Sequence, residues 1–253
     1  MGPLFAETPL PFGSLHLALA GLVIVFNIAL YCCVRGRREG SLLRLLWVLG
    51  LIMMTAEAFK QWYAYVWFYD RQISLYYFPW QLCSLAMYLS FAAIYLKGKR
   101  QEAVLVYLCS FSLLGAVMAL LFPGEMLRRE AVFTLHSFIY HGLIISDAII
   151  ALEILKKRGR PSFRPAVRLF LITAAVAEVI NILGRLLIHD RAREPNMFYI
   201  SPFYPTDQPV LSDIARSAGI LPEVIIYLGC IILASYMIFL AEDRLIFSET
   251  TKL

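Results

Sequence analysis

The chain has 253 residues, of which 60% are hydrophobic and only 16% are charged, and its mean hydropathy is +0.69. A soluble domain of this length normally carries about a quarter charged residues, so the composition excludes an ordinary water-soluble enzyme. The net charge of +5 does not indicate a nucleic-acid partner, because the basic residues lie in short segments between apolar runs, as membrane orientation requires. We therefore expect a polytopic, all-α membrane protein.

Apolar runs of about 20 residues recur along the whole chain and predict seven transmembrane helices in a single transmembrane domain, 1–253. Their expected positions are about 14–34, 43–68, 77–96, 102–122, 131–155, 166–189 and 219–240. The first run has no basic segment before it, so we expect a retained helix and not a cleaved signal peptide.

Lys and Arg residues are distributed unequally over the two sides of these spans. One side collects Arg35, Arg37, Arg38, Arg44, Lys97, Lys99, Arg100, Lys156, Lys157, Arg158, Arg160, Arg164, Arg168, Arg244 and Lys252. The other side collects Arg71, Arg128, Arg129, Arg191, Arg193 and Arg216. The positive-inside rule then predicts that the N-terminus is outside and the C-terminus inside, in a multi-pass protein of the cell membrane.

The one long connection, 190–218, is expected on the outer side. It contains four prolines and four aromatic residues, which makes it too apolar for a disordered linker. We predict that it folds over the outer mouth of the bundle as a cap.

The third expected span opens with FPWQLCSLAMYLS, residues 78–90. Pro79 suits the first turn of a helix, and the neighbouring aromatic residues are typical of a membrane interface. Counting 1.5 Å per residue places Cys83 roughly 9 Å below the outer surface. A thiol near the positive end of a helix is a candidate nucleophile, although a structural thiol remains an alternative.

Other polar side chains fall within the expected spans, where each ionisable group needs a partner or water. They are Glu57, Lys60 and Gln61 in the second span, Gln81 in the third, His136, Tyr140 and His141 in the fifth, Glu178, Asn181 and Arg185 in the sixth, and Glu223 at the start of the seventh. Most lie roughly 6–17 Å from the outer end of their span, at 1.5 Å per residue. This common depth predicts one polar cavity that opens outward.

The alternative is that these groups have a structural role only. Glu57 with Lys60, and Glu178 with Arg185, are equally explained as salt bridges. His136 is expected to be a surface or capping group near the interface. Asp147 lies nearer the inner half, and no partner is predicted for it.

The five cysteines show no CxxC spacing and no pairing with histidine at metal-ligand distances. We therefore expect no disulfide framework, no metal site and no cofactor. Cys109 and Cys230 lie among aliphatic residues and are predicted to behave as small hydrophobic side chains.

A thiol and a histidine at similar depth are the minimum set for nucleophilic catalysis. In this interpretation His141 takes the proton of Cys83, and the thiolate attacks an acyl ester. Asn181 or Gln81 donates to the oxyanion, and Glu178 is a candidate for orienting His141. Arg185 and Lys60 are candidates for holding a lipid headgroup.

Four segments carry a family resemblance: QLCSLAMYLSFAAIYL, FSLLGAVMALLFP, HSFIYHGLII and NMFYISPFYP. In this order they resemble the YwaF-type integral membrane proteins. A related eukaryotic family is similar to membrane acyltransferases that remodel ether phospholipids through a Cys and a His, and more distant relatives are androgen-induced Thr/His hydrolases of fatty-acid esters. The resemblance implies Cys83 as nucleophile and His141 as base. Gln81 departs from it, because a histidine often stands there, and the segment from Asn196 departs from the N-Y-M-Y-L pattern.

The sequence therefore predicts a membrane-embedded acyltransferase, or a lipid-ester hydrolase, whose partner is a membrane lipid and not a nucleic acid. The alternative is a transporter, or a small-molecule- or lipid-binding membrane protein, whose polar cavity works without covalent chemistry. The sequence leaves the oligomeric state open.

Overall fold

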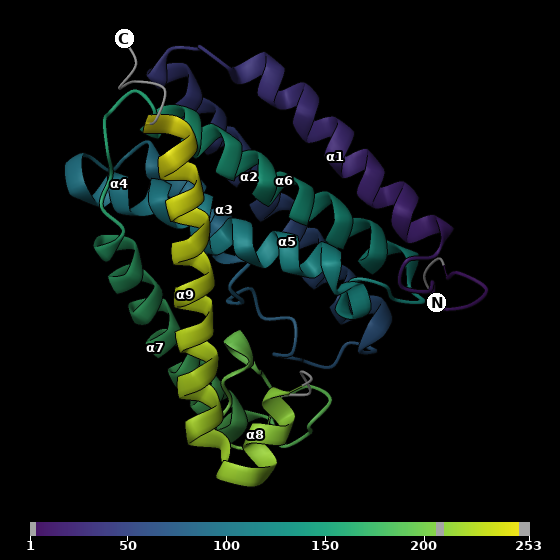
Figure 1. The fold of residues 1–253 in the computed structure, drawn as a ribbon. Coiled ribbons are helices and arrows are strands. Elements are labelled where there is room, and N and C mark those ends of the chain that lie inside the picture. Colours follow the sequence, from purple (N-terminus) through teal and green to yellow (C-terminus); the bar gives the residue numbers. More distant parts are fainter. Residues whose placement is uncertain (1–3, 206–209, 248–253) are drawn as a thin grey trace.

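The structure, a computed structural model, describes residues 4–205 and 210–247, and within them the fold is a helix bundle (Figure 1). The helices are α1 (Ser14–Val34), α2 (Glu39–Tyr63), α3 (Leu85–Ala93), α4 (Gly98–Tyr107), α5 (Leu113–Leu121), α6 (Ala131–Leu155), α7 (Arg164–Leu187), α8 (Leu211–Ala218) and α9 (Ile220–Phe247). One π-helical turn extends α2 to Phe68, and another, Leu108–Ser112, joins α4 to α5.

Six of these rods are long and apolar enough to cross a bilayer. They are α1, the extended α2, the continuous α4–α5, α6, α7 and α9, and they contain 21 to 30 residues each. This finding supports a multi-pass membrane protein. It does not confirm seven helical spans.

Polar contacts define one end of the bundle. Arg158, after α6, donates to Glu39 at the start of α2 (Nε to Oε1, 3.1 Å) and to Gln101 of α4 (2.7 Å). Arg160 donates to Asp243 near the end of α9 (Nε to Oδ1, 2.8 Å). The start of α2, the start of α4 and the ends of α6 and α9 therefore meet at this end, which we call the basic end because most loop Lys and Arg residues lie there.

Other contacts define the opposite end. His16 in α1 binds the Leu120 carbonyl near the end of α5 at 3.1 Å. The Leu75 amide, after α2, donates to the Arg193 carbonyl, after α7, at 2.8 Å. Because α2 ends here and α4 begins at the basic end, the chain between them must run back through the bundle.

That return pass corrects the helix predicted at 77–96. Helix α3 contains only nine residues and is about 14 Å long at 1.5 Å per residue. Residues 77–84 before it are turn and coil, so Pro79 is not in a first helical turn and Cys83 precedes the helix. The expected spans at 14–34 and 131–155 coincide with α1 and α6. The other spans overlap their helices, although α9 continues to Phe247, beyond the predicted end at 240.

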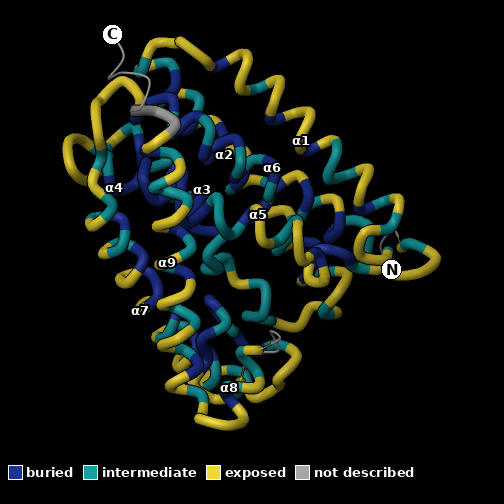
Figure 2. Tube along the Cα trace, viewed as in Figure 1, coloured by how far each residue is buried: buried dark blue, intermediate teal, exposed yellow. Residues whose placement is uncertain are grey.

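Helix α3 is held by close packing against α2. A Cβ added to Gly50 would lie 2.6 Å from the Phe91 backbone nitrogen, so only glycine permits this approach. Helix α6 is the central, most buried rod, whereas α1 is largely exposed along one side (Figure 2). Exposure of apolar side chains carries no penalty in hydrocarbon.

Candidate functional site

The coil at 77–84 is fixed inside the bundle by hydrogen bonds from distant helices. The Trp80 indole donates to the Thr173 carbonyl of α7 at 3.1 Å, and the Tyr88 hydroxyl of α3 donates to the Pro79 carbonyl at 3.2 Å. Non-helical backbone at membrane depth is tolerated only where protein or a water-filled cavity satisfies it. The Tyr88 hydroxyl satisfies the Pro79 carbonyl in this way, and the Trp80 indole anchors the coil to α7 through its side chain.

Residues 196–198 of the predicted cap are anchored to α7 and to the coil at 77–84, and the covering role of the loop stays a prediction. Gln81 donates to the Asn196 carbonyl at 2.9 Å and accepts from the Phe198 amide at 2.7 Å. Asn181 binds the amide and carbonyl of Met197 in the same way. Met197 and Phe198 are at most 1% exposed. Two predicted oxyanion donors, Gln81 and Asn181, thus hold the loop, and their catalytic role stays a prediction.

The polar groups predicted on α2 form one network. Glu57 is buried, and its Oε1 lies 2.7 Å from both Lys60 Nζ and Gln61 Nε2. Gln61 also donates to the Tyr77 carbonyl, which anchors the start of the coil. His136 lies 4.0 Å from Glu57 Oε2. Its side chain is only 10% exposed, so the expectation of a surface group is wrong.

His141 lies one residue beyond Tyr140 on α6. Its Nδ1 is 2.7 Å from the Ser137 carbonyl oxygen, one turn earlier. A carbonyl accepts only, so Nδ1 carries the hydrogen, and Nε2 of the neutral ring is then an acceptor. A histidine in this tautomer has the form required of a general base.

Cys83 lies on the coil two residues before α3 and packs against α5. A Cβ added to Gly115 would lie 3.0 Å from the Cys83 sulfur and 3.7 Å from a Leu82 methyl group. Glycine at this position therefore makes room for the thiol. Among the hydrogen bonds of the described residues, none joins Cys83 to His141.

Tyr140 lies beside His141, and its ring makes an edge contact with the His141 ring, with centroids 6.4 Å apart. The Tyr140 hydroxyl oxygen is buried and has no hydrogen-bond partner within the described part of the chain, which marks it as a donor without an acceptor.

Arg185 and Glu178 do not pair with each other in the structure. Arg185 forms an ion pair with buried Glu194 of the loop and lies 5.9 Å from the Phe203 ring centroid. Its side chain is 42% exposed, so it is reachable from the surface. Just outside α7, hydrogen bonds from Arg193 and the Ala192 amide lower the pKa of Asp190.

The model of the TMEM164 family matches residues 11–241 of the chain. The chain belongs to the TMEM164 family. This is a family of membrane proteins, in agreement with the six apolar helices. No curated protein and no solved structure matches the chain.

Two polar contacts in this TMEM164-family chain were missed from the sequence. Asp147, fully buried, accepts a hydrogen bond from Ser90 of α3 at 2.6 Å. On the opposite face of α6, Asn27 of α1 donates to the Gly142 carbonyl at 3.1 Å and accepts from Ser146 at 2.9 Å. The sequence shows only that these polar residues lie within apolar runs and so need partners. It does not show which residues pair, because the paired positions are 57 to 119 residues apart.

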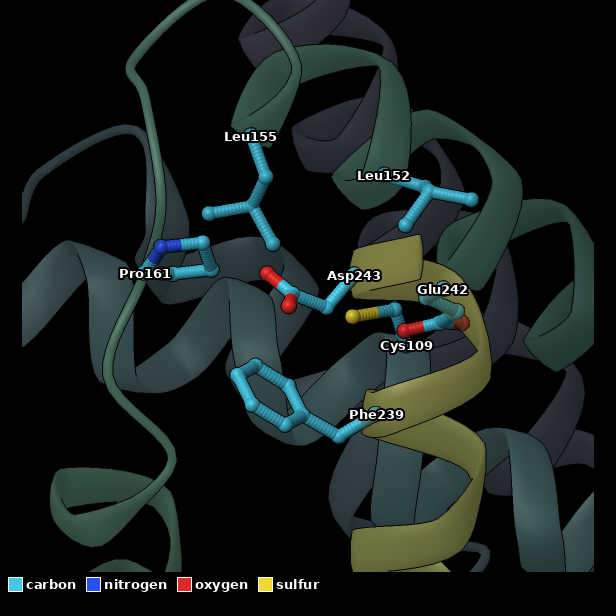
Figure 3. A pocket seen from close by; sticks show the side chains of 7 residues that line it. All are labelled: Cys109, Leu152, Leu155, Pro161, Phe239, Glu242 and Asp243. Carbon is cyan, nitrogen blue, oxygen red and sulfur yellow. The ribbon is translucent and has the colours of Figure 1, made fainter. Parts of the chain in front are cut away.

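The last predicted polar residue, Glu223, lies buried in the first turn of α9, where the helix dipole favours a carboxylate. Nearer the basic end, a cavity of about 10 Å³ is lined by Cys109, Glu242 and Asp243 (Figure 3). The buried Cys109 sulfur faces Glu242 there, whereas Cys230 is exposed on α9. Among the described residues, no group of three His, Cys, Asp or Glu side chains is arranged to hold a metal.

Proposed function

We propose that this TMEM164-family protein is a membrane-embedded transacylase that moves a lipid acyl chain through Cys83. The observation that carries the proposal is the interrupted third pass. A coil at 77–84 takes the place of a helix in this pass. Cys83 on the coil packs against Gly115, which has no side chain to exclude the thiol. Non-helical backbone at membrane depth is tolerated where it is buried in protein or lines a water-filled cavity, and a cavity beside Cys83 would admit a substrate.

His141 is the proposed base. Its Nδ1 hydrogen is committed to the Ser137 carbonyl, which directs the basic Nε2 away from its own helical turn. Histidine general bases contribute typically 10²–10⁴-fold in rate. The Tyr140 hydroxyl, which is buried and unpartnered among the described residues, supports a role as donor to the oxyanion.

The reaction proceeds in two half-steps. The Cys83 thiol loses its proton to His141 Nε2, and the sulfur attacks the ester carbonyl of a lipid. The tetrahedral intermediate collapses as its C–O bond breaks, and His141 returns the proton to the departing alcohol. An acyl thioester remains on Cys83. An acceptor hydroxyl then attacks this thioester and gives its proton to His141. The C–S bond breaks as the new ester forms, and His141 returns the proton to the Cys83 sulfur, which restores the thiol. Water as acceptor makes the same cycle a hydrolysis.

The membrane topology belongs to the proposal. Successive connections along the chain have their contacts at opposite ends of the bundle, which supports seven crossings. Residues 75–97 form the crossing that is not a continuous helix. The basic end then faces the cytoplasm and the N-terminus the outside of the cell membrane. Arg185 is exposed enough to meet a lipid phosphate. The Lys60 side chain is only 15% exposed, so Arg185 is the stronger headgroup candidate.

A second candidate function is ion-coupled transport. The observation that favours it is the buried Glu57–Lys60–His136 network, because intramembrane ionisable groups mark ion pathways. Interrupted helices also occur at transporter binding sites. In this case Cys83 is dispensable.

The test is detection of the acyl thioester by mass spectrometry. Full-length protein in lipid nanodiscs should acquire an acyl adduct on Cys83 that hydroxylamine removes. Cys83→Ala should abolish it, and His141→Gln should slow its formation by about 100-fold. Cys230→Ala, which removes an exposed thiol on α9, is the matched control and should change nothing. An unchanged adduct in Cys83→Ala, or solute counterflow in proteoliposomes that persists without Cys83, would overturn the transacylase.

A further inference from the structure

A groove of about 320 Å³ lies between α1 and α6, and Cys83 is not among the residues that line it. It is lined by Val23, Ile24, Asn27, Ile28 and Tyr31 of α1 and by Ile145 and Ile149 of α6. At 3.6 residues per turn, the α6 lining faces away from Tyr140 and Asp147. The groove is therefore separate from the proposed acyl-transfer site.

One end of the groove is closed by direct contact of the two helices. Asn27 bonds to the Gly142 carbonyl and to Ser146, and a Cβ on Gly142 would lie 3.3 Å from Val23. Because the Asn27 amide is consumed in these bonds, the walls that remain are hydrocarbon. Ile24 and Ile28 stay 57% and 59% exposed.

The other end opens at the basic end of the bundle. The Lys156 ammonium lies 5.7 Å from the Tyr31 ring centroid. Arg35, at the C-cap of α1 four residues after Tyr31, and Lys157, next to Lys156 in the chain, are exposed. The neighbouring carboxylate, Glu153, is already bonded to Lys156 at 2.6 Å. The rim thus carries a net positive charge next to an aromatic ring. Such a rim complements an anionic headgroup.

We infer that this groove binds an anionic phospholipid of the leaflet at the basic end, with one acyl chain between α1 and α6. Its phosphate lies at Lys156 and Arg35, and the chain extends toward Ile28 and Ile24. The volume falls at the lower end of the range for small-ligand sites, about 300–1,000 Å³. The lipid fills the space between α1 and α6 in the half of their interface that the Asn27 hydrogen bonds do not close.

A second copy of the chain is a poorer occupant. Copies inserted in the same membrane orientation bring their basic segments to the same side. A neighbouring helix in the groove would therefore place its own Arg and Lys residues beside Arg35 and Lys156, and like charges repel. The headgroup of an anionic phospholipid carries the opposite charge and is attracted to the same basic residues.

The test is native mass spectrometry of the delipidated full-length protein, titrated with phosphatidylglycerol or phosphatidylcholine. The Ile28→Trp variant fills the groove, and Val25→Trp places the same ring on a lipid-facing position of α1 that is 65% exposed. Blocking about two methylene contacts should weaken phosphatidylglycerol binding about tenfold in Ile28→Trp. Val25→Trp should bind as the wild type does. The double change Arg35→Gln and Lys156→Gln should abolish the preference for phosphatidylglycerol.

Equal binding of the two lipids by the wild type would overturn the inference, as would equal binding by the two Trp variants. Loss of a dimer in Ile28→Trp, with lipid binding intact, would overturn it in favour of a second copy. Thermal unfolding of each variant shows whether the fold is retained, and Leu22→Trp, also on the exposed surface of α1, replaces Val25→Trp if that variant misfolds. Cys83 acylation is unaffected by any of these outcomes, so the lipid site and the proposed transacylase fail independently.

Discussion

Asn181 on α7 binds both backbone groups of Met197 in the loop that follows. The Met197 amide donates to Oδ1 at 2.6 Å, and Nδ2 donates to the Met197 carbonyl at 3.1 Å. Both residues are at most 1% exposed. A side-chain amide thus replaces the hydrogen bonds that a helix or sheet would give this backbone. The loop is part of the folded interior for this reason.

Replacement of Asn181 by Leu should therefore loosen the loop. The change leaves the buried Met197 N–H unpaired, at about 2 kcal/mol. The Met197 carbonyl loses the Asn181 donor and keeps only a long bond from the Ile200 amide, at 3.4 Å. Thermal unfolding in detergent should report the loss, and limited proteolysis should cut faster after Arg191 and Arg193. Ile182→Ala, on the adjacent surface that is 40% exposed, is the control. Equal protease resistance of Asn181→Leu and wild type would contradict the anchoring role.

The contact between α2 and α3 gives a second prediction. Gly50→Ala places a methyl group 2.6 Å from the Phe91 nitrogen, and backbone atoms of a packed helix cannot move aside cheaply. We expect a destabilisation of about 2–3 kcal/mol. Gly40→Ala, in the same helix with nothing within 4 Å, should be neutral or slightly stabilising. Chemical denaturation of both variants in mixed micelles makes the comparison, and similar midpoints would refute the close approach.

Apolar runs were sufficient to predict the long helices, because burial in hydrocarbon demands about 20 consecutive apolar residues. The expected spans at 14–34 and 131–155 match α1 and α6. The third span failed for a physical reason. Its sequence is equally apolar, but side chains such as Gln61 and Tyr88 satisfy backbone carbonyls at 77–84 without a helix. The Trp80 indole also anchors this coil to the Thr173 carbonyl of α7. Nothing within residues 77–96 reveals a partner 93 residues away.

The candidate site was predictable in composition but not in arrangement. The depth count brought Glu57, Lys60 and Gln61 together, and they do form one network. The same count grouped Gln81 and Asn181 with the proposed catalytic residues, whereas both bind the loop. Depth specifies a level in the membrane but not the direction in which a side chain points. The catalytic pair Cys83 and His141 therefore stays a prediction.

The hydrogen bond from Ser90 to Asp147 provides a third prediction. Both residues are fully buried, so Ser90→Ala leaves one carboxyl oxygen without its donor. The expected cost is about 1–3 kcal/mol, measured as a lower unfolding temperature. Asp147→Asn retains an acceptor for Ser90 and should be milder. Its acyl transfer should be close to wild type, because Asp147 has no part in the proposed reaction. A loss of solute transport in Asp147→Asn, with the fold intact, would instead support the ion-coupled function.

Gly115 gives the sharpest test of the position of Cys83. In Gly115→Ala the new methyl group would lie 3.0 Å from the Cys83 sulfur, so the sulfur must shift by a few tenths of an ångström. A displacement of 1 Å costs a catalytic group about 100-fold in rate, and we expect this smaller shift to slow thioester formation about tenfold. Stability should change by only about 1 kcal/mol, because the thiol is on a coil that can adjust. Gly21→Ala on α1, with nothing within 4 Å, should leave the rate unchanged. Time-resolved mass spectrometry of the Cys83 adduct measures both variants. If Gly115→Ala acylates at the wild-type rate, then the surface of α5 does not position the nucleophile.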